Sequence, residues 1–520
     1  MAYLSPDPEL DYPRTDVTSF VLERARELGD KPALIDGPTG RELSFAALAD
    51  GVAALASGLA ARGFAKGDVL GLYMPNIPEY AIVFHGAAAA GGKCTTMNPL
   101  YTAGEASHQL KDSGAKLLVT VPPFLDVARE AAEQAGGVEV FVVGEAEGAT
   151  PFADLFGDPA QAPSVEIDPE ADIAVLPYSS GTTGLPKGVM LTHRNLVANL
   201  AQVQGAFPIS SDDTLVGCLP FFHIYGMTVI MNLGLRQGAT IVTLPRFDLE
   251  QFLGVIEKHR VSRAYVVPPI ALALAKHPAV EGRDLSSVTT IMSGAAPLGA
   301  ELAEQVASRL GCTVVQGYGL TETSPVTHVI RPDGENRPGS IGQPLAGTEC
   351  RLVDPETGED VAKGERGELW IRGPQVMLGY LNNPEATVNT IDGEGWLHTG
   401  DVATADDDGY FFIVDRLKEL IKYKGFQVPP AELEALIITH PKVADVAVIG
   451  VPDEEAGELP KAYVVTAADD FNADELMEWV GEQVAPQKRI RLVEVVDEIP
   501  KSPSGKILRR VLKDREAAKA

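Results

Sequence analysis

Residues 178–193 read YSSGTTGLPKGVMLTH, and this stretch decides how the rest of the chain is interpreted. It joins serine and threonine hydroxyls, glycines and one lysine, with few apolar side chains to anchor it in a core. Strand-like runs lead into it (ADIAVLPYSS) and out of it (GVMLT). Glycine lets backbone N–H groups approach an anion, and hydroxyls and lysine add donors and charge. The stretch therefore predicts a loop that binds a phosphate chain.

This loop differs from the common P-loop, in which the lysine follows a glycine and precedes serine or threonine. Here Lys187 stands between Pro186 and Gly188. The alternative is a surface hairpin rich in turn-forming residues. The density of hydroxyls beside glycine and lysine favours the phosphate loop.

Composition and charge limit the class of protein. A chain of 520 residues exceeds one hydrophobic core, and 45% hydrophobic with 22% charged residues is typical of a soluble globular protein. The net charge of −29 argues against a nucleic-acid partner. Four scattered cysteines predict neither disulfides nor a zinc site. With no signal-peptide pattern and no apolar run of about 18 residues, we expect a cytoplasmic monomer or homodimer without a membrane span.

Strand-like and helical runs alternate up to about residue 340, which predicts βαβ units, and residues 16–29 are predicted to form one capped helix. Short strands and turns follow, and an α+β segment begins after Asp415. We expect an α/β fold with a mobile α+β C-terminal domain (416–520). The N-terminal domain (1–415) is expected to hold parallel αβ-layered subdomains (about 1–175 and 176–340) and a small β-barrel-like subdomain (341–415).

Residues 488–510 hold seven basic and three acidic residues. This excess fits either a solvated face or a positive patch facing a polyanionic ligand.

The stretch 178–193 resembles the phosphate loop of the adenylate-forming superfamily, which contains acyl-CoA synthetases, adenylation domains of peptide synthetases and beetle luciferases. Five further motifs follow in the order of that family: FFHIYG (221–226), SGAAPLG (293–299), QGYGLTE (316–322), the run from GWLHTGD to DRLKELIKYKGFQV (395–428), and PSGKILRR (503–510). FFHIYG and KELIKYKGFQVPPAELE most resemble the 4-coumarate (hydroxycinnamate)–CoA ligases.

The resemblance implies a ligase that uses ATP, Mg²⁺ and CoA. A carboxylate attacks the α-phosphate of ATP and releases pyrophosphate, and a thiolate then displaces AMP from the acyl-adenylate. The residues implied to be catalytic are Lys506, His223, Thr321 and Glu322. Lys506 would reach the carboxylate and the α-phosphate, and Glu322 would bind Mg²⁺. His223 would lie at the mouth of the acyl pocket, without acting as a base, because a carboxylate is already ionised at neutral pH.

Further roles follow from the same resemblance. ATP and AMP would contact Ser179, Ser180, Gly181, Thr182, Thr183, Gly184, Lys187, Ala295, Ala296, Gln316, Gly317, Tyr318, Gly319, Asp401, Arg416, Lys422 and Gln427. Tyr318 would stack on adenine and Asp401 would accept hydrogen bonds from the ribose. Taken alone, Asp401 and Arg416 also fit an ordinary surface ion pair. For thioester formation, the C-terminal domain would rotate about Lys418, bringing Lys424 and Gly425 to the CoA side.

The residues expected to form the acyl pocket are mostly apolar: Ile224, Tyr225, Val229, Met292, Gly294, Gly319, Pro325 and Val326. A flat aromatic acid of the cinnamate type fits such walls, and a medium-chain fatty acid is the alternative. Loading of a carrier protein, luciferase-type oxygenation and non-catalytic nucleotide sensing remain other possibilities. Glu322 and Lys506 together argue against the sensor.

We expect cinnamate to be used at least as well as its hydroxylated derivatives. Plant relatives place a serine and a lysine to meet the ring hydroxyl, where this chain has Val229 and Met292. An apolar wall gains little from a hydroxyl and rejects it weakly. The measurement is kcat/KM across a panel of carboxylates with ATP, CoA and Mg²⁺. A clear preference for caffeate over cinnamate would contradict this prediction.

Overall fold

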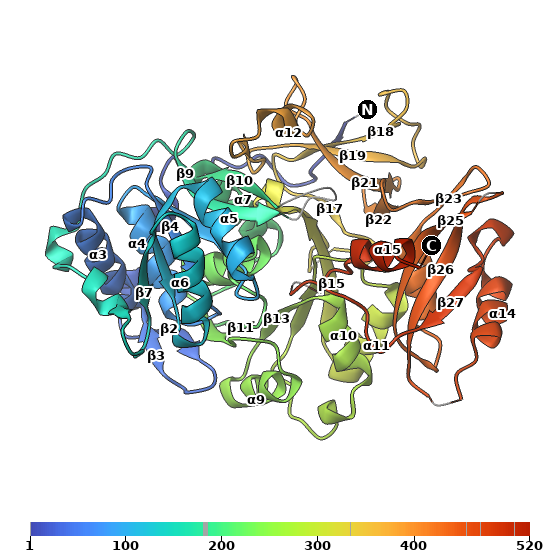
Figure 1. Ribbon diagram of the computed structural model, residues 1–520, viewed down its shortest axis with the longest axis horizontal. Helices are drawn as coiled ribbons and strands as arrows, with labels where there is room; N and C mark the ends of the chain where they lie inside the picture. Colours follow the sequence, from blue (N-terminus) through green and yellow to red (C-terminus); the bar gives the residue numbers. More distant parts are fainter. Residues whose placement is uncertain are drawn as a thin grey trace.

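The computed structural model describes residues 2–179, 186–332, 334–453, 455–468, 470–503 and 505–519. Two broad sheets with their helices form most of the N-terminal part, a small antiparallel sheet lies beside them, and an α+β unit follows at the C-terminal end (Figure 1). The expected α/β fold class is confirmed.

The first broad sheet has eight strands in the order β20-β10-β9-β5-β4-β6-β7-β8. Its strands are β4 (Val69–Tyr73), β5 (Lys93–Thr96), β6 (Ala115–Thr120), β7 (Glu139–Val142), β8 (Thr150–Pro151), β9 (Ile173–Ser179), β10 (Lys187–Thr192) and β20 (Gly379–Tyr380). β9 and β10 pair antiparallel, with Ser179 opposite Lys187. The two ends of the expected phosphate loop are therefore held together.

The second broad sheet has nine strands in the order β17-β16-β15-β14-β13-β11-β12-β2-β3. Its strands are β2 (Pro32–Asp36), β3 (Glu42–Ser44), β11 (Thr214–Gly217), β12 (Thr240–Thr243), β13 (Arg263–Val266), β14 (Thr290–Ser293), β15 (Thr313–Gly319), β16 (Val326–Val329) and β17 (Gln343–Pro344). The chain does not pass from one broad sheet to the other at residue 175, where the boundary between the two αβ subdomains was expected. The reason is that β2 pairs in parallel with β12, while β10 is the hairpin partner of β9.

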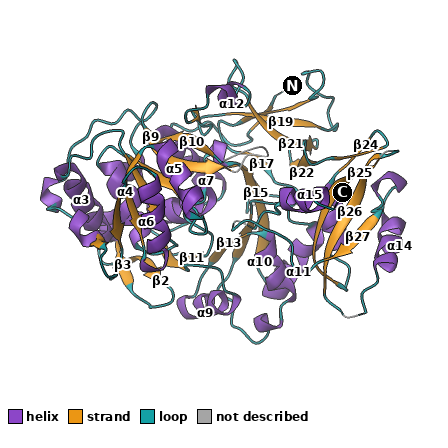
Figure 2. Ribbon diagram, in the orientation of Figure 1, coloured by secondary structure: helices purple, strands orange, loops and turns teal. Residues whose placement is uncertain are grey.

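Helices pack in three layers around the two broad sheets (Figure 2). Between the sheets lie α1 (Val17–Val21), α3 (Phe45–Ala61), α4 (Glu79–Ala89), α7 (His193–Ala206), a π-helix η4 (Tyr225–Asn232) and α8 (Leu233–Gln237). The outer layers hold α5 (Ala103–Ser113) and α6 (Leu125–Gln134) on one side, and α9 (Leu249–His259), α10 (Pro268–Lys276) and α11 (Ala300–Leu310) on the other. One continuous hydrophobic core joins the two sheets through the middle layer. Among the described residues, no helix has the length and hydropathy to cross a membrane.

The prediction of one continuous helix over residues 16–29 is wrong. Asp16 caps α1 by accepting a hydrogen bond from the Ser19 N–H, but α1 ends at Val21 and a separate α2 (Ala25–Leu28) follows. The Ala25 N–H bonds to the carbonyl of Leu22, three residues back, which tightens the chain into a turn there.

The small sheet is antiparallel, in the order β1-β18-β19-β21-β22. Its strands are β1 (Tyr3–Leu4), β18 (Glu349–Val353), β19 (Gly367–Arg372), β21 (Leu397–Ala405) and β22 (Phe411–Arg416), and α12 (Pro384–Val388) precedes β21. The first residues of the chain thus pair with a strand that lies more than 340 positions later in the sequence. β22 ends at Arg416, where the C-terminal part begins.

The C-terminal part has its own sheet and its own cores. Its strands are β23 (Ile421–Tyr423), β24 (Phe426–Val428), β25 (Val443–Asp453), β26 (Gly457–Thr466) and β27 (Leu492–Val495), and its helices are α13 (Pro430–Ile437), α14 (Ala473–Gln483) and α15 (Arg509–Ala517). Alternate residues of β25 face opposite sides, so Val446 and Val448 join one core while Ala447 and Ile449 join another.

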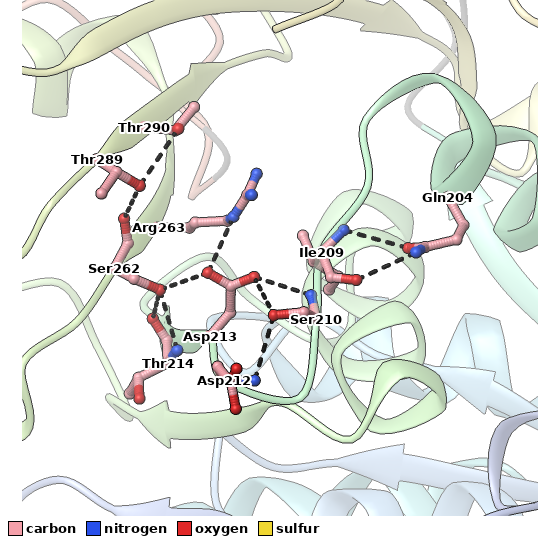
Figure 3. Close-up of polar contacts among 10 residues, drawn as sticks. All are labelled: Gln204, Ile209, Ser210, Asp212, Asp213, Thr214, Ser262, Arg263, Thr289 and Thr290. Carbon is pink, nitrogen blue, oxygen red and sulfur yellow. Dashed lines mark hydrogen bonds and ion pairs between the residues drawn. The ribbon is translucent and has the colours of Figure 1, made fainter.

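A polar cluster fastens the amino ends of the strands in the nine-stranded sheet (Figure 3). Asp213 accepts hydrogen bonds from the Ser262 hydroxyl (2.8 Å), the Arg263 Nε (3.1 Å) and the Ser210 backbone N–H (2.8 Å). Burial alone would raise the pKa of Asp213, but these donors and the Arg263 charge lower it overall. The opposite, carboxyl edge is left for the site.

Two glycine substitutions are expected to change stability in opposite directions. A Cβ at Gly226 in η4 would lie 2.3 Å from the Pro220 carbonyl oxygen, whereas a Cβ at Gly254 in α9 has nothing within 4 Å. Gly226→Ala should lower the free energy of unfolding by about 1–3 kcal/mol through overpacking. Gly254→Ala should raise it by about 0.5–1 kcal/mol, because alanine favours the helix. Denaturant unfolding measures both, and a stable Gly226→Ala protein would contradict the packing argument.

Candidate active site

Several of the expected site residues, among them Tyr318, Asp401 and Arg416, lie where the carboxyl end of β15 faces the β21–β22 hairpin. Open sheets of this type bind ligands beyond the carboxyl ends of their strands. The loop before α15 reaches the same place from the C-terminal part: a Cβ at its Gly505 would lie 3.0 Å from the Val267 side chain. The site is therefore formed by two separate parts of the chain.

Asp401 is the buried centre of one half of the site. It lies opposite Arg416 in the β21–β22 ladder, and the Arg416 Nε is 3.2 Å from its Oδ1. The Tyr318 hydroxyl donates to its Oδ2 at 2.6 Å. The Asp401 charge raises the pKa of the Arg416 guanidinium. Each carboxylate oxygen retains a lone pair, so Asp401 can still accept hydrogen bonds from a hydroxylated ligand.

Lys506 comes to this pair on a tight turn. The Lys506 N–H donates to the Ser502 hydroxyl at 3.1 Å, and its carbonyl accepts from the Ser502 N–H at 2.8 Å. Burial and the neighbouring Arg416 charge lower the pKa of the Lys506 ammonium to about 8, although Glu419 and Asp401 oppose this shift. The Lys506 ammonium and the Arg416 guanidinium are therefore both half-buried in the same region, with few carboxylates to balance their charge. This arrangement favours a ligand with several negative charges.

Glu322 has one occupied and one open carboxylate oxygen. Its Oε1 accepts hydrogen bonds from the Ser179 hydroxyl (2.9 Å) and the Tyr380 hydroxyl (2.9 Å). No described residue donates to its Oε2, so this oxygen is available to a metal ion. Among the residues that the structure describes, no group of three His, Cys, Asp or Glu side chains comes together to hold a metal. A hard cation bound here would take its other ligands from water and phosphate, as Mg²⁺ does.

Tyr380 is a site residue that the sequence did not reveal. It lies 58 positions after Glu322, in the two-residue strand β20. The Lys187 Nζ lies 4.8 Å from the centroid of its ring. Burial, followed by the Glu322 charge, raises the pKa of Tyr380, so its hydroxyl remains a donor. No short local motif marks this tyrosine, because its role depends on strand pairing with β10.

The structure describes only part of the expected phosphate loop. Ser180, Gly181, Thr182, Thr183 and Gly184 lie outside the described residues. Lys187 and Ser179 frame that segment, and Lys187 forms no ion pair with any described residue.

The turn expected to frame a nucleotide base is fixed to β15. Ala295 has φ of 68°, which is unusual for a residue with a side chain, and it is exposed next to the half-buried Ala296. The Gln316 side-chain oxygen accepts a hydrogen bond from the Leu298 N–H at 2.9 Å. Gly317 follows on the same strand and Thr321 lies half-buried one residue before Glu322.

His223 is half-buried at the start of η4. Burial and the Lys506 charge lower the pKa of its imidazole to about 4, so the ring is neutral at neutral pH. Its Nδ1 accepts a hydrogen bond from the Tyr225 N–H at 3.3 Å. The proton of the neutral ring therefore belongs on Nε2, which makes His223 a donor toward the site.

The expected acyl-pocket residues lie close together. The Tyr225 hydroxyl donates to the Met292 carbonyl at 3.2 Å, and a Cβ at Gly294 would lie 3.0 Å from the Tyr225 ring. A Cβ at Gly319 would lie 2.0 Å from the Pro325 carbonyl oxygen. The remaining members are buried apolar side chains: Ile224, Val229 and Val326.

Two residues expected to contact the nucleotide, Lys422 and Gln427, and the two expected on the CoA side, Lys424 and Gly425, do not join the site in this arrangement. All four belong to the exposed β23–β24 hairpin. The Lys424 Nζ instead pairs with Glu455 at 2.6 Å. The expected hinge residue, Lys418, is exposed just after Arg416.

The basic excess over residues 488–510 is largely neutralised within the C-terminal part. Lys488 pairs with Glu432 at 2.5 Å, Lys501 with Asp445 at 2.5 Å, and Arg509 with Glu434 at 2.6 Å. Arg509 also pairs with Glu419. These pairs do not support the interpretation of the whole segment as one polyanion-binding patch.

Comparison with known proteins gives consistent results. A family model described as AMP-binding enzyme matches residues 21–381, and one described as AMP-binding enzyme C-terminal domain matches residues 432–506. The chain is 44% identical to 4-coumarate–CoA ligase 3 of Oryza sativa subsp. japonica, covering 99% of this chain and 94% of the relative. It is 46% identical to 4-coumarate–CoA ligase of Pinus taeda, covering 96% and 95%.

Solved structures show the same fold over nearly the full chain. The anthranilate CoA ligase AuaEII in complex with anthranoyl-AMP has a TM-score of 0.89 at 29% identity, with 98% of each chain covered. ATP-bound MatB from Rhodopseudomonas palustris has a TM-score of 0.87 at 30% identity, covering 97% of this chain and 100% of that one.

The Lys506 amine is expected to lose its proton near pH 8, well below the usual lysine value of about 10.4. Competitive labelling with acetic anhydride, read by peptide mass spectrometry, should show its reactivity rising as pH increases through 8. Arg416→Met should move that midpoint upward, because a neighbouring positive charge is removed. A midpoint at the ordinary value in the unaltered protein would show that the ammonium is not held beside Arg416.

Proposed function

Because the chain belongs to the AMP-binding enzyme family, we propose that it is an ATP-dependent carboxylate–CoA ligase for an aromatic, cinnamate-type acid. The proposal rests on one observation: Lys506 lies near Arg416 and Asp401 at the carboxyl edge of the nine-stranded sheet. The relatives named as 4-coumarate–CoA ligases give the substrate class. The four cysteines, which are all unpaired, fit a cytoplasmic location.

The reaction has two balanced steps. A carboxylate oxygen attacks the α-phosphorus of ATP, and the bond to the β-phosphate oxygen breaks, giving acyl-adenylate and pyrophosphate. The CoA thiol then loses its proton to solvent, the resulting thiolate attacks the acyl carbon, and AMP leaves. The first transition state concentrates negative charge, so positioning and charge stabilisation are the main needs.

In the first step, Lys506 bridges the attacking carboxylate and the α-phosphate. His223 donates from Nε2 toward the carboxylate and orients it. Asp401 accepts hydrogen bonds from the ribose, Tyr318 contacts the adenine, and Lys187 binds the departing diphosphate. Mg²⁺, held by the open oxygen of Glu322, would neutralise charge on the phosphate oxygens.

The second step requires the C-terminal domain, residues 416–520, to turn relative to residues 1–415. Lys418 is exposed between two fixed points: the Leu417 N–H bonds to the Gly400 carbonyl at 2.8 Å, and Glu419 pairs with Arg509. Turning there would withdraw Lys506 and present the exposed β23–β24 hairpin, with Gly425 leaving room for pantetheine.

Two variants should separate the half-reactions. Lys506→Ala should reduce acid-dependent ATP–pyrophosphate exchange by about 100-fold or more, since removing one charge-stabilising donor has effects of about that size. It should leave thioester formation from supplied acyl-adenylate nearly unchanged. Lys418→Pro should do the reverse, because proline fixes the backbone angle that the rotation must change.

Lys418→Ala is the control and should keep both steps. Wild-type exchange by Lys506→Ala would contradict the proposed role of that lysine, and equal loss of both steps in Lys418→Pro would contradict the hinge. If the unaltered protein forms no CoA thioester from any aromatic acid, the proposed function itself is wrong.

A further inference from the structure

The proposed function leaves open how Glu322 and Lys187, which come from distant parts of the sequence, are kept in a fixed relation. Tyr380 contacts both. Its hydroxyl donates to the Glu322 Oε1 at 2.9 Å, and its ring centroid lies 4.8 Å from the Lys187 Nζ. An ammonium within about 6 Å of an aromatic face is attracted by the ring. One side chain thus touches the groups assigned to the metal and to the diphosphate.

The backbone around Tyr380 is firmly attached at both ends. β20 pairs with β10, with Val189 opposite Tyr380. The Leu378 N–H bonds to the Met190 carbonyl at 3.0 Å, and the Leu381 N–H bonds to the Gly188 carbonyl at 2.8 Å. These bonds place Tyr380 beside the first residues of β10, where Lys187 begins the strand.

The same segment also holds the backbone of Glu322. The Met377 N–H donates to the Glu322 carbonyl at 2.8 Å, and the Ser324 hydroxyl donates to the Gln375 carbonyl at 2.9 Å. The Tyr380 N–H is itself bonded to the Thr387 hydroxyl of α12 at 2.9 Å. The backbone of Tyr380 is therefore held in place, and its hydroxyl in turn holds the Glu322 side chain.

The geometry at Glu322 shows what this contact achieves. The Tyr380 and Ser179 hydroxyls both bind Oε1, and no described residue binds Oε2. Two donors on one oxygen fix the rotation of the carboxylate and leave the other oxygen without a donor among the described residues. A carboxylate oriented in advance binds a cation with less loss of side-chain freedom.

We propose that Tyr380 is a positioning residue that holds the Oε2 of Glu322 toward the metal of the nucleotide complex while its ring supports the Lys187 ammonium. This inference rests on the proposed function. It differs from a packing role because it predicts a change in metal dependence without loss of the fold. In this proposal Tyr380 acts through Glu322 and Lys187 and not through the substrate.

The test uses Tyr380→Phe, which keeps the ring and removes the hydroxyl. Nucleotide affinity is measured by calorimetry without any acid, once with excess Mg²⁺ and once with EDTA. The Mg²⁺-dependent gain in ATP affinity should shrink by about 3- to 10-fold, the range expected for one ordinary hydrogen bond, because the Ser179 hydroxyl still holds the same oxygen. The free Mg²⁺ needed for half-maximal pyrophosphate exchange should rise by a similar factor, while the rate at saturating Mg²⁺ and thioester formation from supplied adenylate should be little altered.

A second variant separates the ring from the hydroxyl. Tyr380→Leu removes both, so it should repeat the metal effect and also raise the KM for pyrophosphate in the exchange assay, because Lys187 loses its support. Ser179→Ala removes the other donor to Oε1 and should reproduce the metal effect; because Ser179 is itself expected to contact the nucleotide, ATP affinity in EDTA should fall as well.

The matched control is Tyr178→Phe, on the neighbouring strand β9. Its hydroxyl donates to the Asp112 Oδ2 at 2.6 Å, a carboxylate outside the site. This variant should keep wild-type metal dependence. The proposal is overturned if Tyr380→Phe keeps the wild-type metal dependence, or if it loses both half-reactions together with thermal stability. Failure of the proposed function would appear differently, as absence of acid-dependent exchange in the unaltered protein.

Discussion

The site depends on one electrostatic constraint: the Lys506 ammonium is placed beside the Arg416 guanidinium. Burial is the largest cause of the lowered pKa of Lys506, the Arg416 charge lowers it further, and Glu419 and Asp401 oppose this shift. A ligand with several negative charges relieves the repulsion, so binding such a ligand and docking the C-terminal loop stabilise each other. Once the diphosphate has left, part of that stabilisation is lost, which gives a physical reason for the loop to withdraw.

A buried charge cluster delivers the lysine to this position. Arg509, three residues after Lys506, pairs with Glu434 and with Glu419, beside the expected hinge. Burial raises the pKa of Glu434 and Asp415, and the Arg509 charge opposes both shifts. Because breaking a buried pair is strongly unfavourable, the loop and the hinge segment should move as one unit with the C-terminal sheet. Such pairs add more to the choice of one geometry than to net stability.

The sequence contained enough information for the fold class and for those site residues that lie in dense local motifs, such as Glu322 and Lys506. Their roles remain proposals, but the structure places both in one region. Tyr380 was missed because its importance comes from pairing between β20 and β10, which leaves no local pattern. The position of β2 in the second sheet was missed for the same reason. Counting charges over residues 488–510 could not show that carboxylates from other elements neutralise most of the basic excess.

The acyl-pocket walls illustrate why side-chain identity alone is a weak guide to specificity. Tyr225 carries a hydroxyl that would suit a phenolic substrate, yet this hydroxyl already donates to the Met292 carbonyl. Because a phenolic oxygen both donates and accepts, a ligand hydroxyl can still donate to Tyr225 while this bond is kept. The bond to the Met292 carbonyl holds the ring against Gly294, where an added Cβ would lie 3.0 Å from the Tyr225 ring. A bond to the backbone thus fixes the position of the ring, and the hydroxyl can contribute to recognition only as an acceptor.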